Sequence, residues 1–298
     1  MATTTTPRDL ALGGSARIRD RATVARQRAG RTVVYGTLVT LAVIFTLPFI
    51  WMVLASFKTQ RQVLSSFDVI PDPWTAEGYI RGWTSLPVGS FITNSVIYSG
   101  TVLAAVIITS SLTAFAFSRL HWKGRDFWFV LALSTMMVPP QVLLLPQFIF
   151  FTRILNWSNT LLPLILPLAL GHPFYIFLLR QFFLTLPTEL DEAARMDGAS
   201  SWGIYWRIIL PLAKPALATV GLFAFIFTWN DFLGPLIYLH SLDRMTFAVG
   251  LQLFRGQFTT DFPALMAMST LSLMPIITIF FFTQKTYIKG IALTGIKG

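Results

Sequence analysis

The sequence has no cysteine and few charged residues. Of its 298 residues only 12% are Asp, Glu, Lys or Arg, whereas 54% are hydrophobic. Soluble domains carry about 25% charged residues, so this composition is not that of an ordinary soluble domain. The absence of cysteine excludes disulfide bonds and cysteine-ligated metal sites within the chain.

Two further kinds of site are missing from the sequence. The three histidines, His121, His172 and His240, are dispersed without the i, i+4 spacing of a helical metal site. No Gly-Lys pair occurs anywhere, so the chain lacks the GxxxxGK[ST] loop that holds nucleotide phosphates. We therefore expect no bound metal, no cofactor and no catalytic site in this chain.

Long hydrophobic runs dominate what remains. About twenty apolar residues span a bilayer core, and six nearly uncharged stretches are long enough. They cover residues 32–57, 91–117, 127–151, 158–179, 216–240 and 263–284. As core helices of a soluble protein they would leave too little polar sequence to coat them. The sequence therefore predicts an all-α, polytopic membrane protein with six transmembrane helices.

Basic residues set the expected orientation, because Lys and Arg favour the cytoplasmic side. With the N-terminus inside, 17 of the 23 Lys and Arg residues fall in cytoplasmic segments. Both termini are therefore expected in the cytoplasm, and no basic surface is left for nucleic acid. Residues 1–31 read as a basic, disordered tail before the membrane domain 32–298. The first apolar run is too long for a signal peptide.

One polar segment, residues 180–215, interrupts the apolar sequence between the fourth and fifth runs. Pro187 suits the first turn of a helix, and the acids that follow suit a helix N-terminus. Gly198 suits the left-handed residue after that helix. Two short helices joined by a glycine turn are predicted.

The second of these helices has its own signals. Ser200 or Ser201 can cap its start, and Pro211 is expected to end it. Its larger apolar residues recur at i, i+3, i+4 and i+7, which predicts one apolar face. They are Trp202, Tyr205, Trp206 and Ile209.

Seven positions in this segment form a spaced motif. They are Glu192, Ala193, Ala194, Gly198, Ile208, Leu210 and Pro211. The motif resembles the EAA loop of bacterial ABC importer permeases. The stretches at 229–236 and 266–269 and the closing residues 295–298 are similar to the carbohydrate-uptake, maltose-permease-like branch. The resemblance covers roughly residues 32–298.

The resemblance implies a role for the chain and a set of partners. The chain would be the transmembrane permease subunit of an ATP-driven sugar importer in the bacterial inner membrane. Its motif would dock into a separate ATPase subunit, which holds ATP and Mg. A second related permease, two ATPase subunits, an extracytoplasmic sugar-binding protein and membrane lipid are the implied partners.

A few residues inside the spans are candidates for the translocation path. Asn230 and Asp231 lie within the fifth run, and ionisable residues at membrane depth are functional by default. Pro139 and Pro140 interrupt the third run, where broken backbone can line a cavity. The alternative for Asp231 is that it caps or hydrogen-bonds a neighbouring helix.

Two other functions stay open at this point. An ion-coupled carrier would place charges along several spans, and a membrane-embedded transferase would need clustered Asp, His or Ser near an interface. No Lys or Arg lies deep in a span, and this favours a neutral sugar as the cargo. Glycerol phosphate is the alternative.

Overall fold

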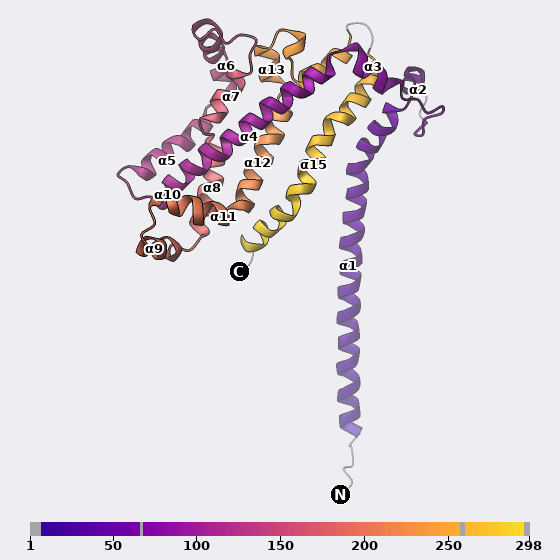
Figure 1. Cartoon of the computed structure of the whole chain (residues 1–298). Coiled ribbons are helices and arrows are strands. Elements are labelled where there is room, and N and C mark those ends of the chain that lie inside the picture. Colours follow the sequence, from indigo (N-terminus) through magenta and orange to yellow (C-terminus); the bar gives the residue numbers. More distant parts are fainter. Residues whose placement is uncertain (1–6, 66–67, 257–259, 295–298) are drawn as a thin grey trace. The chain divides into compact units, whose positions relative to one another are not determined.

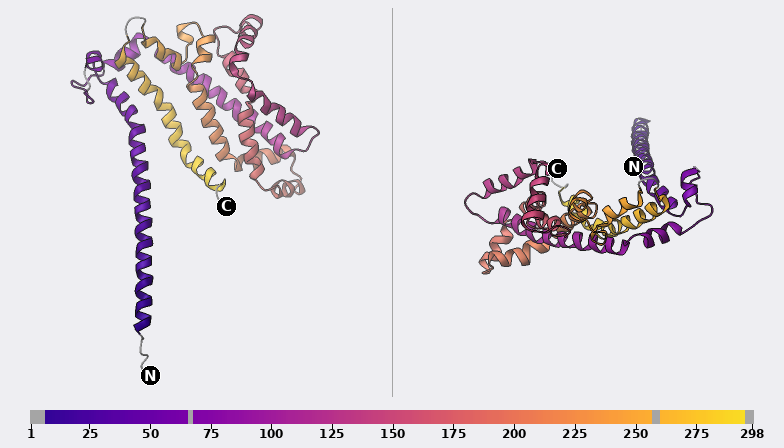
Figure 2. Two further views of the ribbon diagram at one scale, coloured as in Figure 1. Left: turned by 180° about the vertical axis from the view of Figure 1, so that it is seen from behind. Right: turned by 90° about the horizontal axis from the view of Figure 1, so that it is seen from above.

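The computed structural model describes the backbone of residues 7–65, 68–256 and 260–294, and the side chains of the same residues except 7–29 and 285–294. The chain divides into two compact units, Met1–Leu54 and Ala55–Gly298. Figures 1 and 2 show the elements from three sides.

The described part of the first unit is one long helix, α1 (Pro7–Ser56), whose last two residues belong to the second unit. Its part from Gly30 to Ser56 is long and apolar enough to cross a membrane, which agrees with the first predicted span. The backbone is also helical from residue 7 to residue 31, where the sequence predicts a disordered tail. The domain boundary at 31 stays a prediction.

The second unit is a bundle of helices around α4 (Val88–Arg119). This helix packs against α7 (Leu162–Ala169), α8 (Pro173–Thr185) and α12 (Lys214–Trp229), and α12 packs against α15 (Phe262–Thr294). Figure 1 shows these helices lying alongside one another. In the described part of the chain there is no strand beyond an isolated bridge between Arg255 and Thr260. The all-α prediction is confirmed.

The buried core explains why α4 is central. Tyr98, Val102 and Val106 of α4 belong to one core cluster with Leu179 and Phe183 of α8, and all five are nearly inaccessible to solvent. Many other large apolar side chains are exposed along the helices. In a membrane protein such side chains face lipid or another helical subunit, so the exposed apolar surface is consistent with the transmembrane assignment.

The expected spans are present, but not all are single helices. Among the described residues, four helices qualify as spans, and two bent pairs raise the number to as many as six. The third run, 127–151, is interrupted at Pro139 and Pro140, as the sequence indicates. That stretch contains α5 (Arg125–Ser134), η1 (Thr135–Met137), α6 (Pro140–Ile149) and the π-helical η2 (Phe150–Ile154). The two halves meet at 92°, since Pro139 and Pro140 cannot continue a helical hydrogen-bond ladder.

The fifth run is also interrupted. Helix α12 ends at Trp229, and the short helix α13 (Leu233–Tyr238) follows. The fourth run divides into α7 and α8, with Gly171 at a left-handed φ of 113° between them. Such breaks at membrane depth are tolerated where they face protein or a water-filled cavity.

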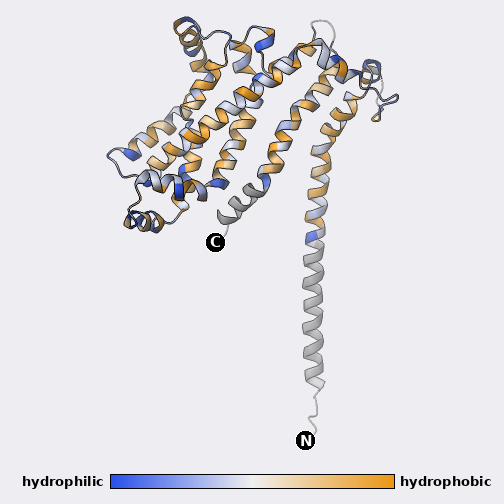
Figure 3. Ribbon diagram, viewed as in Figure 1, coloured by the Kyte–Doolittle hydropathy of each residue, from blue (hydrophilic) through white to orange (hydrophobic). Residues whose placement is uncertain are grey.

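Polar residues gather at the two ends of the second unit, and apolar residues fill its length (Figure 3). One end carries α9 (Glu189–Met196) and α10 (Ser201–Ile204), and we call it the α9 end. The other carries α2 (Gln60–Ser65), α3 (Glu77–Ser85), η4 (Leu242–Arg244), α14 (Phe247–Gly250) and η5 (Leu251–Phe254), and we call it the α3 end.

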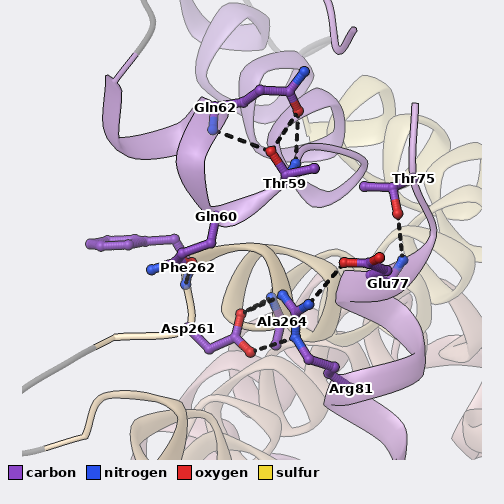
Figure 4. A network of polar contacts seen from close by, with 9 residues as sticks. All are labelled: Thr59, Gln60, Gln62, Thr75, Glu77, Arg81, Asp261, Phe262 and Ala264. Carbon is purple, nitrogen blue, oxygen red and sulfur yellow. Dashed lines mark hydrogen bonds and ion pairs between the residues drawn. The ribbon is translucent and has the colours of Figure 1, made fainter. Parts of the chain in front are cut away.

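A polar network secures the start of α15 at the α3 end (Figure 4). Arg81 on α3 donates from Nε to Asp261 at 2.9 Å and pairs with Glu77 at 3.1 Å. The hydrogen bond with Asp261 raises the pKa of the Arg81 guanidinium above its usual value. Asp261 also accepts from the backbone N–H of Ala264 at 3.1 Å, and Gln60 accepts from that of Phe262. The loop 58–90 is therefore folded against α15.

Candidate functional site

The helix α9 has an inner and an outer face. Asp191 and Ala194, three positions apart, are buried against the rest of the second unit. Glu192, Ala193 and Met196 are exposed. Side chains three apart share a helix face, so the buried pair turns the motif residues Glu192 and Ala193 outward. The arrangement offers a small surface, with an alanine that permits close approach and a carboxylate beside it.

The turn after α9 has the predicted conformation. Gly198 has φ of 80°, in the left-handed region that favours glycine. The backbone N–H of Ala199 bonds back to Ala194 at 2.9 Å, which closes the helix end. The Ser200 hydroxyl accepts from the N–H of Gly203 at 3.2 Å and so caps α10. Both the glycine turn and the serine cap are confirmed.

Two proline predictions are wrong. Pro187 lies in the three-residue connection between α8 and α9, and α9 begins only at Glu189. Pro211 does not end the second helix, which continues through the π-helical η3 (Tyr205–Ile209) into α11 (Leu210–Leu212). In this π-helical turn, the backbone N–H of Leu210 donates to the carbonyl of Tyr205, five residues back. The helix can therefore accommodate a proline at the next position.

The predicted apolar face is divided between the core and the surface. Tyr205 and Ile209 are 2% and 0% exposed and belong to the core, whereas Trp202 and Trp206 are 59% and 51% exposed. The Tyr205 hydroxyl is 2.7 Å from the Ser111 hydroxyl of α4. The buried side of this helix is the one that carries Ile204, Tyr205 and Ile209, so the two tryptophans fall beside it and not on it.

The seven motif residues therefore differ in exposure. Exposed at the surface are Glu192, Ala193, Gly198 and Pro211, half-buried are Ile208 and Leu210, and Ala194 is buried. They lie on two consecutive short helices at the α9 end (Figure 1). The four exposed residues can be contacted by a partner, whereas the other three anchor the segment to the bundle.

Sequence reasoning missed the residue that holds α9 in place. Arg119, the last residue of α4, is 3% exposed at its side chain, and its Nη1 lies 3.3 Å from Oδ2 of Asp191. Its Nη2 donates to the carbonyls of Phe183 and Leu186 at 2.6 and 2.7 Å. These carbonyls lie at the end of α8, where helix geometry leaves acceptors unused. No sequence motif links residues 72 positions apart.

The candidate path residue Asp231 occupies the break between α12 and α13. Its Oδ2 accepts from the Tyr98 hydroxyl of α4 at 2.9 Å, and its Oδ1 accepts from the backbone N–H of Gly234 at 3.2 Å. A methyl group on Gly234 would lie 2.7 Å from Asp231 and 2.9 Å from Leu164. Asp231 therefore both caps α13 and joins it to α4, as the alternative expects. A substrate contact stays a prediction.

The other path candidates lie elsewhere. The Asn230 amide donates to the carbonyl of Ile226 at 2.8 Å, and Asn230 is exposed. Pro139 and Pro140 are exposed at the 92° bend between η1 and α6. Within the described ranges, no hydrogen bond joins this bend to Asp231. Asn230 and Asp231 lie together only because they are neighbours in the sequence. The two prolines lie on a separate element.

Among the described residues, no three His, Asp or Glu side chains gather in a way that could hold a metal ion.

Comparison with known proteins gives a consistent result. A family model of binding-protein-dependent transport system inner membrane components matches residues 106–292. A probable ABC transporter permease protein of Bacillus subtilis is 35% identical over 90% of this chain and 89% of its own length. An arabinooligosaccharides transport system permease protein of Halalkalibacterium halodurans is 34% identical over 87% and 93%. A trehalose/maltose transport system permease protein of Thermococcus litoralis is 34% identical over 87% and 94%.

The fold also has a close counterpart among solved structures. A chain of a bacterial ABC transporter involved in the import of the acidic polysaccharide alginate matches with a TM-score of 0.74. The match covers 95% of this chain and 99% of the other at 21% identity. At this identity the likeness concerns the fold.

Proposed function

The chain belongs to the family of binding-protein-dependent transport system inner membrane components, and on that basis we propose that its α9–α10 segment docks onto a separate ATPase subunit of a sugar importer. In this role the chain is a permease subunit that forms half of the translocation pathway. The α9–α10 segment passes the movement of the ATPase to the membrane helices.

One observation carries the docking proposal. The exposed residues Glu192 and Ala193 lie on the outer face of α9, and Gly198 follows at the exposed turn. Asp191 and Ala194 hold the opposite face to the bundle. A short helix with one anchored face and one small, charged outer face suits a groove on a partner, where Glu192 can pair with a basic residue.

The cargo class rests on the relatives and on charge. Two permease relatives are named for arabinooligosaccharides and for trehalose/maltose. Asp231, the ionisable residue at the break in the fifth span, is an acid, and the buried Arg119 already contacts three acceptors at the α9 end. Asp231 would repel an anionic cargo, and Arg119 is already engaged with its three acceptors. A neutral oligosaccharide fits better than glycerol phosphate.

The remaining partners follow from the same role. A second permease and lipid would cover the exposed apolar side chains of the helices. Two ATPase subunits would bind ATP and Mg, since this sequence has no phosphate-binding loop. An extracytoplasmic sugar-binding protein would deliver the cargo. ATP binding would close the ATPases, displace α9 and switch the pathway from inward-facing to outward-facing.

An uptake assay in cells that lack any redundant importer tests the proposal. Glu192→Lys should lower sugar uptake about tenfold or more, because a like charge facing a basic groove costs several kcal/mol. Glu189→Lys is the matched control, since Glu189 is an exposed acid in the same helix outside the motif. Equal uptake by both variants and the wild type would refute docking through Glu192.

The same cells distinguish the alternative functions. An ion-coupled carrier would continue to transport after ATP is depleted, and a membrane-embedded transferase would modify the sugar rather than accumulate it.

A further inference from the structure

The helix α4, with 32 residues, is the longest helix of the second unit that has no proline inside it. It contains no proline, unlike α6, α7, α12 and α15. From Tyr98 to Arg119 it extends about 30 Å at 1.5 Å per residue. Such a helix can carry a displacement along its axis without bending at a break.

Both ends of α4 are fastened to functional elements. At the α9 end, Arg119 binds Asp191 of α9. Further along the helix, Tyr98 donates to Asp231 in the break of the fifth span at 2.9 Å. Asn94 donates to the carbonyls of Asp243 and Met245 at 2.8 and 3.0 Å. One rigid helix thus connects the docking segment to the interrupted span and to the α3 end.

The covalent chain gives α9 a short link to α8, through residues 186–188. It gives no such link to α4, which is 72 residues away at the contact. The Arg119 side chain instead provides a polar contact between α4 and α9. It also binds the last carbonyls of α8. Only a guanidinium offers several donors in one plane, so a lysine would not serve all three acceptors.

The position of this pair on α9 separates it from docking. Asp191 is on the buried face and Glu192 on the exposed face. A change at Arg119 therefore leaves the outer surface of α9 chemically unaltered. The inner contact governs how α9 is joined to the bundle.

We propose that Arg119 is the positioning residue that makes α4 move with α9, so that displacement of the docking helix reaches the Tyr98–Asp231 contact in the membrane. This inference rests on the proposed docking of α9. It adds that the movement of α9 is transmitted through α4. This transmission depends on the contacts of Arg119 with its three acceptors.

The test uses the complex purified from its host and placed in lipid nanodiscs. Because this chain has no cysteine, a single Phe232→Cys substitution beside Asp231 provides a reporter, and Phe232 is exposed. Its labelling rate with a maleimide is measured without nucleotide and with ATP plus vanadate. ATP hydrolysis and retention of the ATPase are measured on the same sample.

In the reporter background, nucleotide should change the labelling rate about fivefold or more, the lower end of coupling between two sites. Arg119→Lys should retain the ATPase and its hydrolysis, yet the labelling rate should no longer respond to nucleotide. Arg125→Lys is the matched control, since Arg125 pairs with exposed Asp126 at the start of α5 and should keep the response.

The other outcomes are separable. A complex that contains no ATPase even in the wild type refutes the proposed docking. A full nucleotide response in Arg119→Lys overturns the transmission role while docking stands. Loss of the ATPase from Arg119→Lys also overturns it, because the arginine would then serve docking. If Arg119→Lys does not fold, Asp191→Asn, which keeps the side-chain shape, decides by the same readouts.

Discussion

The Tyr98 hydroxyl donates to the Asp231 carboxylate across 2.9 Å, and this contact joins the uninterrupted helix α4 to the break in the fifth span. Asp231 simultaneously caps α13 through the backbone N–H of Gly234. One carboxylate therefore both joins α13 to α4 and caps its start.

Removal of this hydroxyl tests the contact. Tyr98→Phe should lower the stability of the purified chain by about 1.5–3 kcal/mol, because a hydrogen bond to a charged group is lost. Tyr238→Phe is the control, since it keeps the ring contacts of Tyr238 with Phe148 and Phe151. Thermal unfolding in detergent measures both, and equal midpoints would contradict the importance of the Tyr98 contact.

Close packing at Gly234 makes a second prediction. A methyl group there would meet Asp231 and Leu164 at under 3 Å. Gly234→Ala should therefore cost about 1–3 kcal/mol and reduce uptake. Gly100→Ala on α4 has open space around the added carbon and should stabilise the helix by up to about 1 kcal/mol. Unfolding midpoints in the opposite order would contradict the geometry.

The α9–α10 segment offers a matched pair of glycines, one in the turn and one in α10. Gly198→Ala should cost about 1–2 kcal/mol, because an L-residue is strained at this positive φ, and it should lower uptake by misdirecting α9. Gly203→Ala meets its neighbours at ordinary contact distance and should leave uptake near the wild-type value. Uptake assays on both variants, with membrane levels checked by immunoblot, measure the difference.

Two arginines in ion pairs should differ greatly in their effect on stability. Arg119→Met leaves Asp191 buried without its cation and should cost about 3–5 kcal/mol. Arg81→Met removes a partly exposed pair with Asp261 and should cost about 1 kcal/mol or less. Denaturant titration in mixed micelles gives the two values. Similar losses would show that the burial of Arg119 does not govern its contribution.

Local signals in the sequence were sufficient for several features. Apolar runs identified the membrane helices, and Gly198 and Ser200 identified the turn and the cap at the α9 end. These features depend on neighbouring residues and on a regular period, which a sequence displays directly.

Other features could not be read in this way. The predicted apolar face of the second helix is divided: Tyr205 belongs to the core, whereas Trp202 and Trp206 are exposed, because tertiary packing decides which side of the helix is buried. Arg119 and Asp191 are 72 residues apart, and only the packing of α4 on α8 brings them together. The bend at Pro139–Pro140 was signalled by two prolines, but its angle of 92° depends on tertiary contacts.

The central claim is that Glu192 on the outer face of α9 docks the chain onto an ATPase. The most direct measurement is purification of the tagged chain from its own host in mild detergent, followed by mass spectrometry of the proteins that accompany it. The account predicts a second permease and an ATPase with the wild type, and selective loss of the ATPase with Glu192→Lys. A chain that purifies alone, under conditions that keep known importers intact, would contradict it.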